Sequence, residues 1–282
     1  MMYRFLHLLT LPLVVIFFFV AKSYALTITN VSSPQDLVDT IVDPSSITIT
    51  NVSFTGTLTA VGLFSGGNDS GLDINSGIIL TTGSAQGAIG PNDSDSYSVD
   101  NGLAGDSDLD ALVSPYETYD ATVLEFDFTT SSGDLYFNFI FASEEYEEYV
   151  NSEFNDVFAF YVDGVNIALI PNTSEPITVN TVNQLTNSEY YVSNVSGDYD
   201  IQYDGFTTVL TASILGLSSG THHMKIAIAD TSDHIYDSAV FIEAGTFSGY
   251  NPEPVPEPST ALLVCLGLFI MGAMIARKKI YQ

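Results

Sequence analysis

The sequence predicts an all-β protein: a two-sheet sandwich of jelly-roll type, with short helices in its loops and a single C-terminal transmembrane helix. Segments in which apolar and polar residues alternate recur between residues 26 and 250, with turn residues between them. The same part contains no convincing amphipathic stretch of ordinary helix length. A total of 18 Phe and 16 Tyr supply core volume in a chain without Trp. Many short strands and few helices favour two packed sheets.

The first 25 residues have the features of a secretory signal peptide. Arg4 precedes an almost wholly apolar run over residues 8–20, and the small residues Ser23 and Ala25 stand at the positions that specify cleavage. We expect cleavage after Ala25. The alternative is an uncleaved membrane anchor, which is disfavoured because the run is shorter than the roughly 20 residues that a spanning helix needs.

Residues 26–250 are expected to form one β-sandwich domain, because no linker divides them. The expected strands are residues 46–52, 123–128, 135–141, 157–162, 206–214, 224–229 and 239–244. Asp163 and Gly164 are expected to form a hairpin turn. Two stretches are expected to be short helices: residues 33–41, with Ser33 as the cap, and residues 144–154.

Three different segments follow the sandwich. Residues 251–259 form a proline-rich linker by composition, residues 260–276 are expected to be the transmembrane helix, and residues 277–282 are expected to be a basic cytoplasmic tail. Because the basic tail stays in the cytoplasm, the acidic body is expected to lie outside the inner membrane.

The order of these segments resembles the PEP-CTERM sorting signal of Gram-negative bacteria, with Pro256, Glu257 and Pro258 as the motif. The resemblance implies that an exosortase recognises the motif and that residues 260–276 reside in the inner membrane only transiently. It also implies removal of the helix and delivery to the cell surface or to an exopolysaccharide matrix. A permanent single-pass anchor is the alternative.

The body resembles choice-of-anchor L domains over nearly all of residues 55–248. The matching segments, in order, are residues 106–109, 120–128, 141–150, 154–158, 203–207 and 237–241. Members of that family are attached to surfaces by alternative C-terminal signals, of which PEP-CTERM is one. The resemblance therefore implies a location and a fold, and no particular chemistry.

The charge of the chain is strongly one-sided. It has 34 acidic residues against 6 basic ones, and Lys225 is the one base outside the two ends. Such a surface repels nucleic acid and anionic lipid and attracts divalent cations, so nucleic-acid binding is excluded. The single cysteine, Cys265, lies in the apolar C-terminal stretch, which leaves the body without a disulfide, a zinc-thiolate site or a cysteine nucleophile.

Calcium is the predicted cofactor, since it binds oxygen ligands in loops rich in Asp, Asn, Gly and Ser. Two acidic clusters stand at the ends of apolar strands, where desolvated like charges are costly unless a cation or a proton neutralises them. The candidate ligands from these clusters are Glu144, Glu145, Asp156, Asp230, Asp233 and Asp237, and a further loop offers Asp106 and Asp108. The simpler alternative for any one carboxylate is a solvated surface that keeps an exported protein soluble.

Three apparent motifs are discounted. The spacing of Asp106 to Glu117 fits an EF-hand loop, but Ala111 stands where the sharp turn needs Gly. Residues 216–220 fit the G-x-S-x-G pattern but lie between two strands, so they are expected to be a turn. His222 and His223 diverge on a strand, and His234 is expected to be a surface or loop residue.

We therefore expect no catalytic residues and a non-enzymatic, calcium-binding protein displayed on the surface or in the matrix. Its expected role is adhesion or exopolysaccharide association, with extracellular polysaccharide or another surface protein as the partner. The alternative is a hydrolase or lyase acting on extracellular polysaccharide, which requires two carboxylates opposed across a bound sugar.

Overall fold

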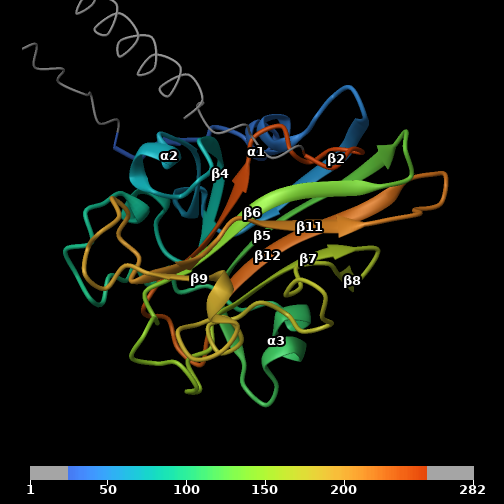
Figure 1. The fold of residues 1–282 in the computed structure, drawn as a ribbon. Coiled ribbons are helices and arrows are strands. Elements are labelled where there is room, and N and C mark those ends of the chain that lie inside the picture. The colour runs from blue at the N-terminus through green and yellow to red at the C-terminus, as the bar shows by residue number, and fades with distance from the viewer. Residues whose placement is uncertain (1–24, 253–282) are drawn as a thin grey trace, which may run out of the picture.

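The computed structural model describes residues 25–252, which fold into two antiparallel sheets packed against each other (Figure 1). The larger sheet has the order β1 (Thr27–Asn30), β3 (Val61–Ser65), β4 (Ser76–Thr81), β13 (Ser238–Glu243), β6 (Leu135–Ser143), β10 (Gly205–Thr207) and β9 (Tyr191–Ser193), and β11 (Leu210–Ile214) also pairs with β6. The smaller sheet has the order β2 (Ile47–Thr55), β5 (Thr118–Thr130), β12 (His222–Thr231), β7 (Val157–Val162) and β8 (Val165–Asn166). The all-β sandwich is thus confirmed, and the jelly-roll class remains a prediction.

The main core lies between the sheets and follows the period-two pattern of the strands. In β5, Phe126 and Phe128 are fully buried, whereas Glu125 and Asp127, which alternate with them, are partly exposed. Phenylalanine rings from both sheets meet in this core: Phe139 of β6 lies 5.5 Å from Phe158 and 5.0 Å from Phe160 of β7, between ring centroids. Edge-to-face contacts of this kind add to the stabilisation that burial alone provides.

Two smaller cores cover the outer faces of the sandwich. On the larger sheet, Ala142, Phe206 and Phe241 pack beneath a segment that includes η2 (Ala85–Ala88). On the smaller sheet, α3 (Ser107–Val113) packs its buried residues against β7 and β12, at the bottom of Figure 1. Each sheet is therefore apolar on both faces over much of its length.

The remaining helices are short. The helix α1 (Pro34–Ile41) confirms the prediction for residues 33–41: the Ser33 side chain accepts a hydrogen bond from the backbone N–H of Gln35, and Asp36 completes a capping box. The other short helices are α2 (Gly67–Ser70), η1 (Leu58–Ala60) and η3 (Ser188–Tyr190).

Two sequence predictions differ from the structure. Residues 144–154 were expected to be helical but form successive turns, because Glu144 and Glu145 are buried and their N–H groups bond to Asp237 and Ser143 outside any helical pattern. The single strand expected over residues 206–214 is divided into β10 and β11, both paired with β6. The hairpin turn at residues 163–164 is confirmed by the pairing of Val162 with Val165.

The predicted signal peptide, the transmembrane helix over residues 260–276 and the basic tail lie outside the described residues, apart from Ala25. Between residues 25 and 252, no helix has the length and apolar character needed to cross a membrane.

Candidate metal centre

Every buried carboxylate of residues 25–252 lies at one end of the sandwich, which we call the acidic pole. None of these side chains belongs to a residue more than 2 % exposed. The seven residues of the acidic pole are Asp120, Glu144, Glu145, Asp156, Asp204, Asp230 and Asp237. They come from the end of β6, the end of β12, the start of β5, and the residues just before β7, β10 and β13. Strand pairing therefore collects residues that are up to 117 positions apart, from Asp120 to Asp237.

Four of them form an inner group between the two sheets. Ala229 pairs with Val157, so the next pair along the ladder is Asp230 opposite Asp156. Both side chains lie on the face that carries Ile228 and Phe158 of the main core. Asp120 lies in β5, at the register shift where β5 pairs with residues 228–230 of β12. Glu145 is close enough to this pair that the charges of Asp156 and Asp233 contribute to raising its pKa. The inner group is thus Asp120, Glu145, Asp156 and Asp230.

The other three form an outer group on the opposite face of the larger sheet. Ser143 pairs with both Gly205 and Ser238. The residues adjacent to these, Glu144, Asp204 and Asp237, therefore form the next row across three neighbouring strands. This row has the same orientation as Ala142, Phe206 and Ala239, which belong to the outer core. The outer group is thus Asp204, Glu144 and Asp237.

Some of these carboxylates are well supplied with donors. Asp156 accepts hydrogen bonds from the Thr231 N–H (2.9 Å) and the Ser238 hydroxyl (2.6 Å). Asp120 accepts from the N–H groups of Asn101 (3.0 Å) and Leu103 (2.6 Å). These bonds offset part of the cost of burying the two carboxylates, but burial still raises the pKa of Asp156 to about 8.

Other carboxylate oxygens of the acidic pole have no hydrogen-bond partner. They are both oxygens of Glu144 and of Asp230, and one oxygen each of Glu145, Asp204 and Asp237. Burying such groups is costly unless something neutralises them. Within the described residues the one base in contact with the pole is His234, and Lys225 is engaged elsewhere. Protons or bound cations must therefore supply the neutralisation.

The pKa values of the buried carboxylates show the same energetic cost of burying an ionised group. Burial, with a smaller contribution from Asp204, raises the pKa of Glu144 to about 9. Burial and then Asp156 raise that of Glu145 to about 10. Burial raises the pKa of Asp237 to about 7 and places that of Asp230 well above its ordinary value. A divalent cation reverses this balance by stabilising the ionised form.

The structure divides the candidate ligands predicted from sequence. Glu144, Glu145, Asp156, Asp230 and Asp237 all lie in the acidic pole. Asp233 lies at its rim, partly exposed, and its carboxylate accepts a hydrogen bond from the Ile235 N–H.

Asp106 and Asp108 lie away from these residues, on the outer face of the smaller sheet. Their carboxylates contact the Lys225 Nζ at 2.8 and 2.6 Å. Asp106 also caps α3 by accepting from the N–H groups of Asp108 and Leu109. These two residues therefore neutralise the lysine and do not join the acidic pole.

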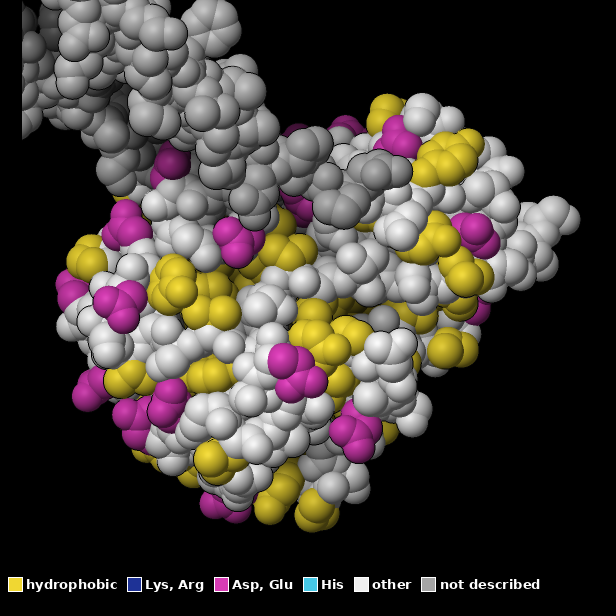
Figure 2. Space-filling model, in the orientation of Figure 1, with side chains coloured by type: hydrophobic (Ala, Val, Ile, Leu, Met, Phe, Trp, Pro, Cys, Tyr) yellow, Lys and Arg dark blue, Asp and Glu magenta, His cyan; other side chains and the backbone are white. Residues whose placement is uncertain are grey.

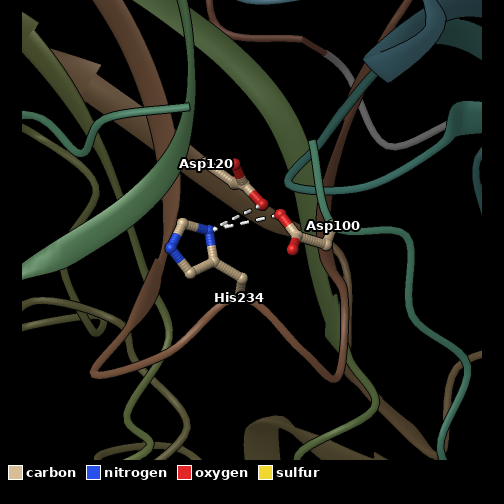
Figure 3. A group of neighbouring side chains, drawn as sticks. All are labelled: Asp100, Asp120 and His234. Carbon is tan, nitrogen blue, oxygen red and sulfur yellow. Dashed lines mark ion pairs between the residues drawn. The ribbon is translucent and has the colours of Figure 1, made fainter. Parts of the chain in front are cut away.

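One further set of side chains already has the spacing of metal ligands. Figure 3 shows Asp100, Asp120 and His234 converging, and their ligand atoms lie within 4.8 Å of one another. The His234 Nδ1 is 3.1 Å from an oxygen of Asp120 and 3.6 Å from one of Asp100. Among residues 25–252 no other three Asp, Glu, His or Cys side chains meet this spacing. The set also fits a simple contact between His234 and Asp120 without a metal, because Asp100 is exposed and Asp120 has its two backbone donors.

Sequence reasoning missed Asp120, Asp204 and His234. Asp204 belongs to an acidic run, and His234 lies between two acidic residues of the loop that precedes β13. The one available signal was this proximity in the chain, and it did not show which side chains are buried.

The remaining carboxylates are distributed differently. On the face drawn in Figure 2, acidic side chains are spread among uncharged ones without forming a single patch. This is the arrangement expected of a solvated surface. Burial therefore distinguishes the acidic pole from the rest of the acidic residues.

Comparisons with known proteins give two matches. A family model described as Choice-of-anchor L domain matches residues 27–248, and a model of the PEP-CTERM protein-sorting motif matches residues 254–279. Both resemblances predicted from the sequence are thereby confirmed. No curated protein and no solved structure matches the chain.

Proposed function

The chain belongs to the choice-of-anchor L domain family and carries a PEP-CTERM sorting motif, and from this premise we propose that it is a non-enzymatic, calcium-stabilised protein of the cell surface or extracellular matrix. The motif makes it an exported, surface-sorted protein that an exosortase processes. Adhesion to exopolysaccharide or to another surface protein is the role we assign to the displayed sandwich.

The observation that carries the calcium part of the proposal is the inner group of buried carboxylates. Asp230 is 1 % exposed, both of its carboxylate oxygens are without hydrogen-bond partners, and it lies beside Asp156. Two desolvated carboxylates side by side are strongly destabilising in their ionised form. A cation bound here would link β7 and β12 of one sheet to the end of β6 in the other through Glu145.

The chemistry of the donors favours calcium over transition metals. Calcium takes six to eight oxygen ligands from carboxylates and carbonyls, whereas zinc and copper prefer imidazole or thiolate. The inner group supplies carboxylates alone. Extracellular calcium sites of this kind bind with dissociation constants of about 0.1–1 mM.

The alternative function, a hydrolase or lyase acting on extracellular polysaccharide, remains a prediction. Such an enzyme needs carboxylates that reach a bound sugar. The carboxylates of the acidic pole are enclosed within the protein in this structure, an arrangement that favours cation binding. Turnover of the organism's own exopolysaccharide by the purified protein would support the enzyme alternative.

The proposal is tested by thermal unfolding of the full-length chain in detergent, with calcium or with a chelator. Calcium at about 100 times its dissociation constant should stabilise the fold by about 2.7 kcal/mol. The variant Asp230→Asn should lose most of this gain, while Asp198→Asn, at an exposed site, should keep it. Equal melting temperatures of the wild type with and without calcium would remove calcium from the proposed function.

A further inference from the structure

We propose that the outer group, Asp204, Glu144 and Asp237, binds a second calcium ion at a site separate from the inner group. The proposal rests on the proposed function in using the same cation, but it is carried by different residues on a different face of the larger sheet. It assigns the chain two structural cations.

The row geometry brings the three carboxylates within reach of one ion. Glu144 stands on the central strand of the three, between Asp204 on the β10 side and Asp237 on the β13 side. Neighbouring strands are about 4.8 Å apart, and side chains directly across from each other project on the same face. A cation above Glu144 is therefore flanked by a carboxylate on each side. The backbone N–H of Glu144 also bonds to the Asp237 carbonyl (3.1 Å), which holds these two strand ends together.

The free oxygens point to a missing ligand. Glu144 is fully buried, and neither of its carboxylate oxygens has a hydrogen-bond partner. Asp204 and Asp237 each have one oxygen fixed by the protein, through the Asn92 side-chain amide (2.7 Å) and the Val99 N–H (3.0 Å) respectively. The second oxygen of each is buried and unpartnered. This leaves four unsatisfied carboxylate oxygens in one row, and hard cations with oxygen ligands are the class of ligand that satisfies them.

The outer and inner groups project to opposite faces of the larger sheet, and the charge of Asp237 acts across it on Asp156 and Asp230. Successive residues of a strand project to opposite faces. The serines of the adjacent row face the interior, where the Ser238 hydroxyl donates to Asp156 of the inner group. The backbone of the larger sheet therefore lies between the outer row and the unpartnered oxygens of Asp230.

Because the carboxylate oxygens of the outer group are spaced more widely than the ligand atoms of Asp100, Asp120 and His234, binding of a cation would draw Glu144, Asp204 and Asp237 together by side-chain rotation.

A cation at the outer group would also hold the segment that covers it. Asn92 and Val99 bond to the outer carboxylates, and the Asp237 N–H donates to the Tyr97 carbonyl (3.2 Å). Residues 92–99 are thus tied to Asp204 and Asp237, and they are also held by Gln202, whose side-chain amide donates to the Ser94 carbonyl (2.8 Å), and by the Tyr236 N–H, which donates to the Ser98 hydroxyl. Loss of the ion should loosen this segment and leave the strands intact.

The stoichiometry of binding tests the proposal. The full-length chain in detergent is dialysed to equilibrium against radioactive calcium, and the bound equivalents per chain are counted. We expect two equivalents for the wild type and for Asp198→Asn, one for Glu144→Gln, one for Asp230→Asn, and none for the double variant. Circular dichroism verifies that each variant keeps its β structure.

A second measurement separates binding at the outer group from a general loosening of the fold. Hydrogen exchange of the Val99 amide in calcium should speed up at least tenfold in Glu144→Gln and change less than threefold in Asp230→Asn. If the wild type binds one equivalent of calcium, and if Asp230→Asn loses it while Glu144→Gln keeps it, the second site is refuted and the proposed function stands. A single equivalent lost in both variants would also refute it, and no binding by the wild type would overturn both proposals.

Discussion

Replacing Glu144 by Gln should change how the stability of the metal-free protein depends on pH. Burial raises the pKa of Glu144 in the folded state to about 9, from an ordinary value of 4.5. The folded state therefore holds this proton more tightly than the unfolded state does. Its contribution is fully present below about pH 4.5 and is lost as the pH rises toward the folded pKa. The slope is about 1.4 kcal/mol per pH unit, so the wild type loses about 4 kcal/mol between pH 5 and pH 8 through this one group.

Gln has the shape of protonated Glu and does not titrate, so Glu144→Gln should escape that loss. The free energies of unfolding in urea, followed by circular dichroism in chelator-treated buffer, should be similar for variant and wild type at pH 5. At pH 8 the variant should be more stable by about 4 kcal/mol. The exposed control Glu175→Gln should show no such change with pH. The reasoning fails if the difference between Glu144→Gln and wild type is the same at both pH values.

Saturating calcium should reverse the advantage at pH 8. The ionised Glu144 then has a cation to bind, and the amide of Gln is a weaker ligand than a carboxylate. The variant should therefore gain less stability from calcium than the wild type does. An equal gain in both proteins would separate the burial of Glu144 from calcium binding.

Three further predictions concern other parts of the chain. The His222 Nδ1–H donates to the Asp163 carboxylate at 2.6 Å, and this bond raises the pKa of His222 above 6.5. The stabilisation is present below pH 6.5 and is lost as the pH rises through the folded pKa, so His222→Gln should destabilise the fold more at pH 5 than at pH 8 in urea titrations. A Cβ at Gly83 would collide with the Asp237 carboxylate. Gly83→Ala should therefore lower the free energy of unfolding by about 1–3 kcal/mol. An unchanged midpoint of urea unfolding would contradict this close packing. Replacing Pro256, Glu257 and Pro258 by Ala should leave the precursor unprocessed in the membrane fraction, as judged by its size on an immunoblot, whereas normal processing would show that the motif is not what the exosortase reads.

Much of the fold was predictable because it depends on local patterns. The continuous apolar run over 157–162, which ends at the turn residues 163–164, reproduces β7 to the residue, and the Ser33-Pro34 start marks α1. The prediction failed at residues 144–154, which were expected to be helical and form turns. Local propensity there is overridden by the burial of both side chains at the junction of the sheets.

The candidate site was predictable only in part. Glu144, Glu145, Asp156, Asp230 and Asp237 could be selected because they adjoin apolar strands. Their division into an inner and an outer group could not, since it depends on pairing between strands far apart in the chain. Asp204 shows the limit most clearly: it is placed beside Glu144 by the pairing of Gly205 with Ser143, a contact that no local pattern encodes.

The sequence by itself determined the β architecture, the export and sorting of the chain, and an acidic body with one lysine, because periodicity, targeting signals and charge are properties of composition and local order. Tertiary structure alone decided which seven carboxylates of residues 25–252 are shielded from water and to which of the two groups each one belongs. The physical reason is that burial and strand register arise from long-range pairing, in which a shift of a single residue moves a side chain to the opposite face.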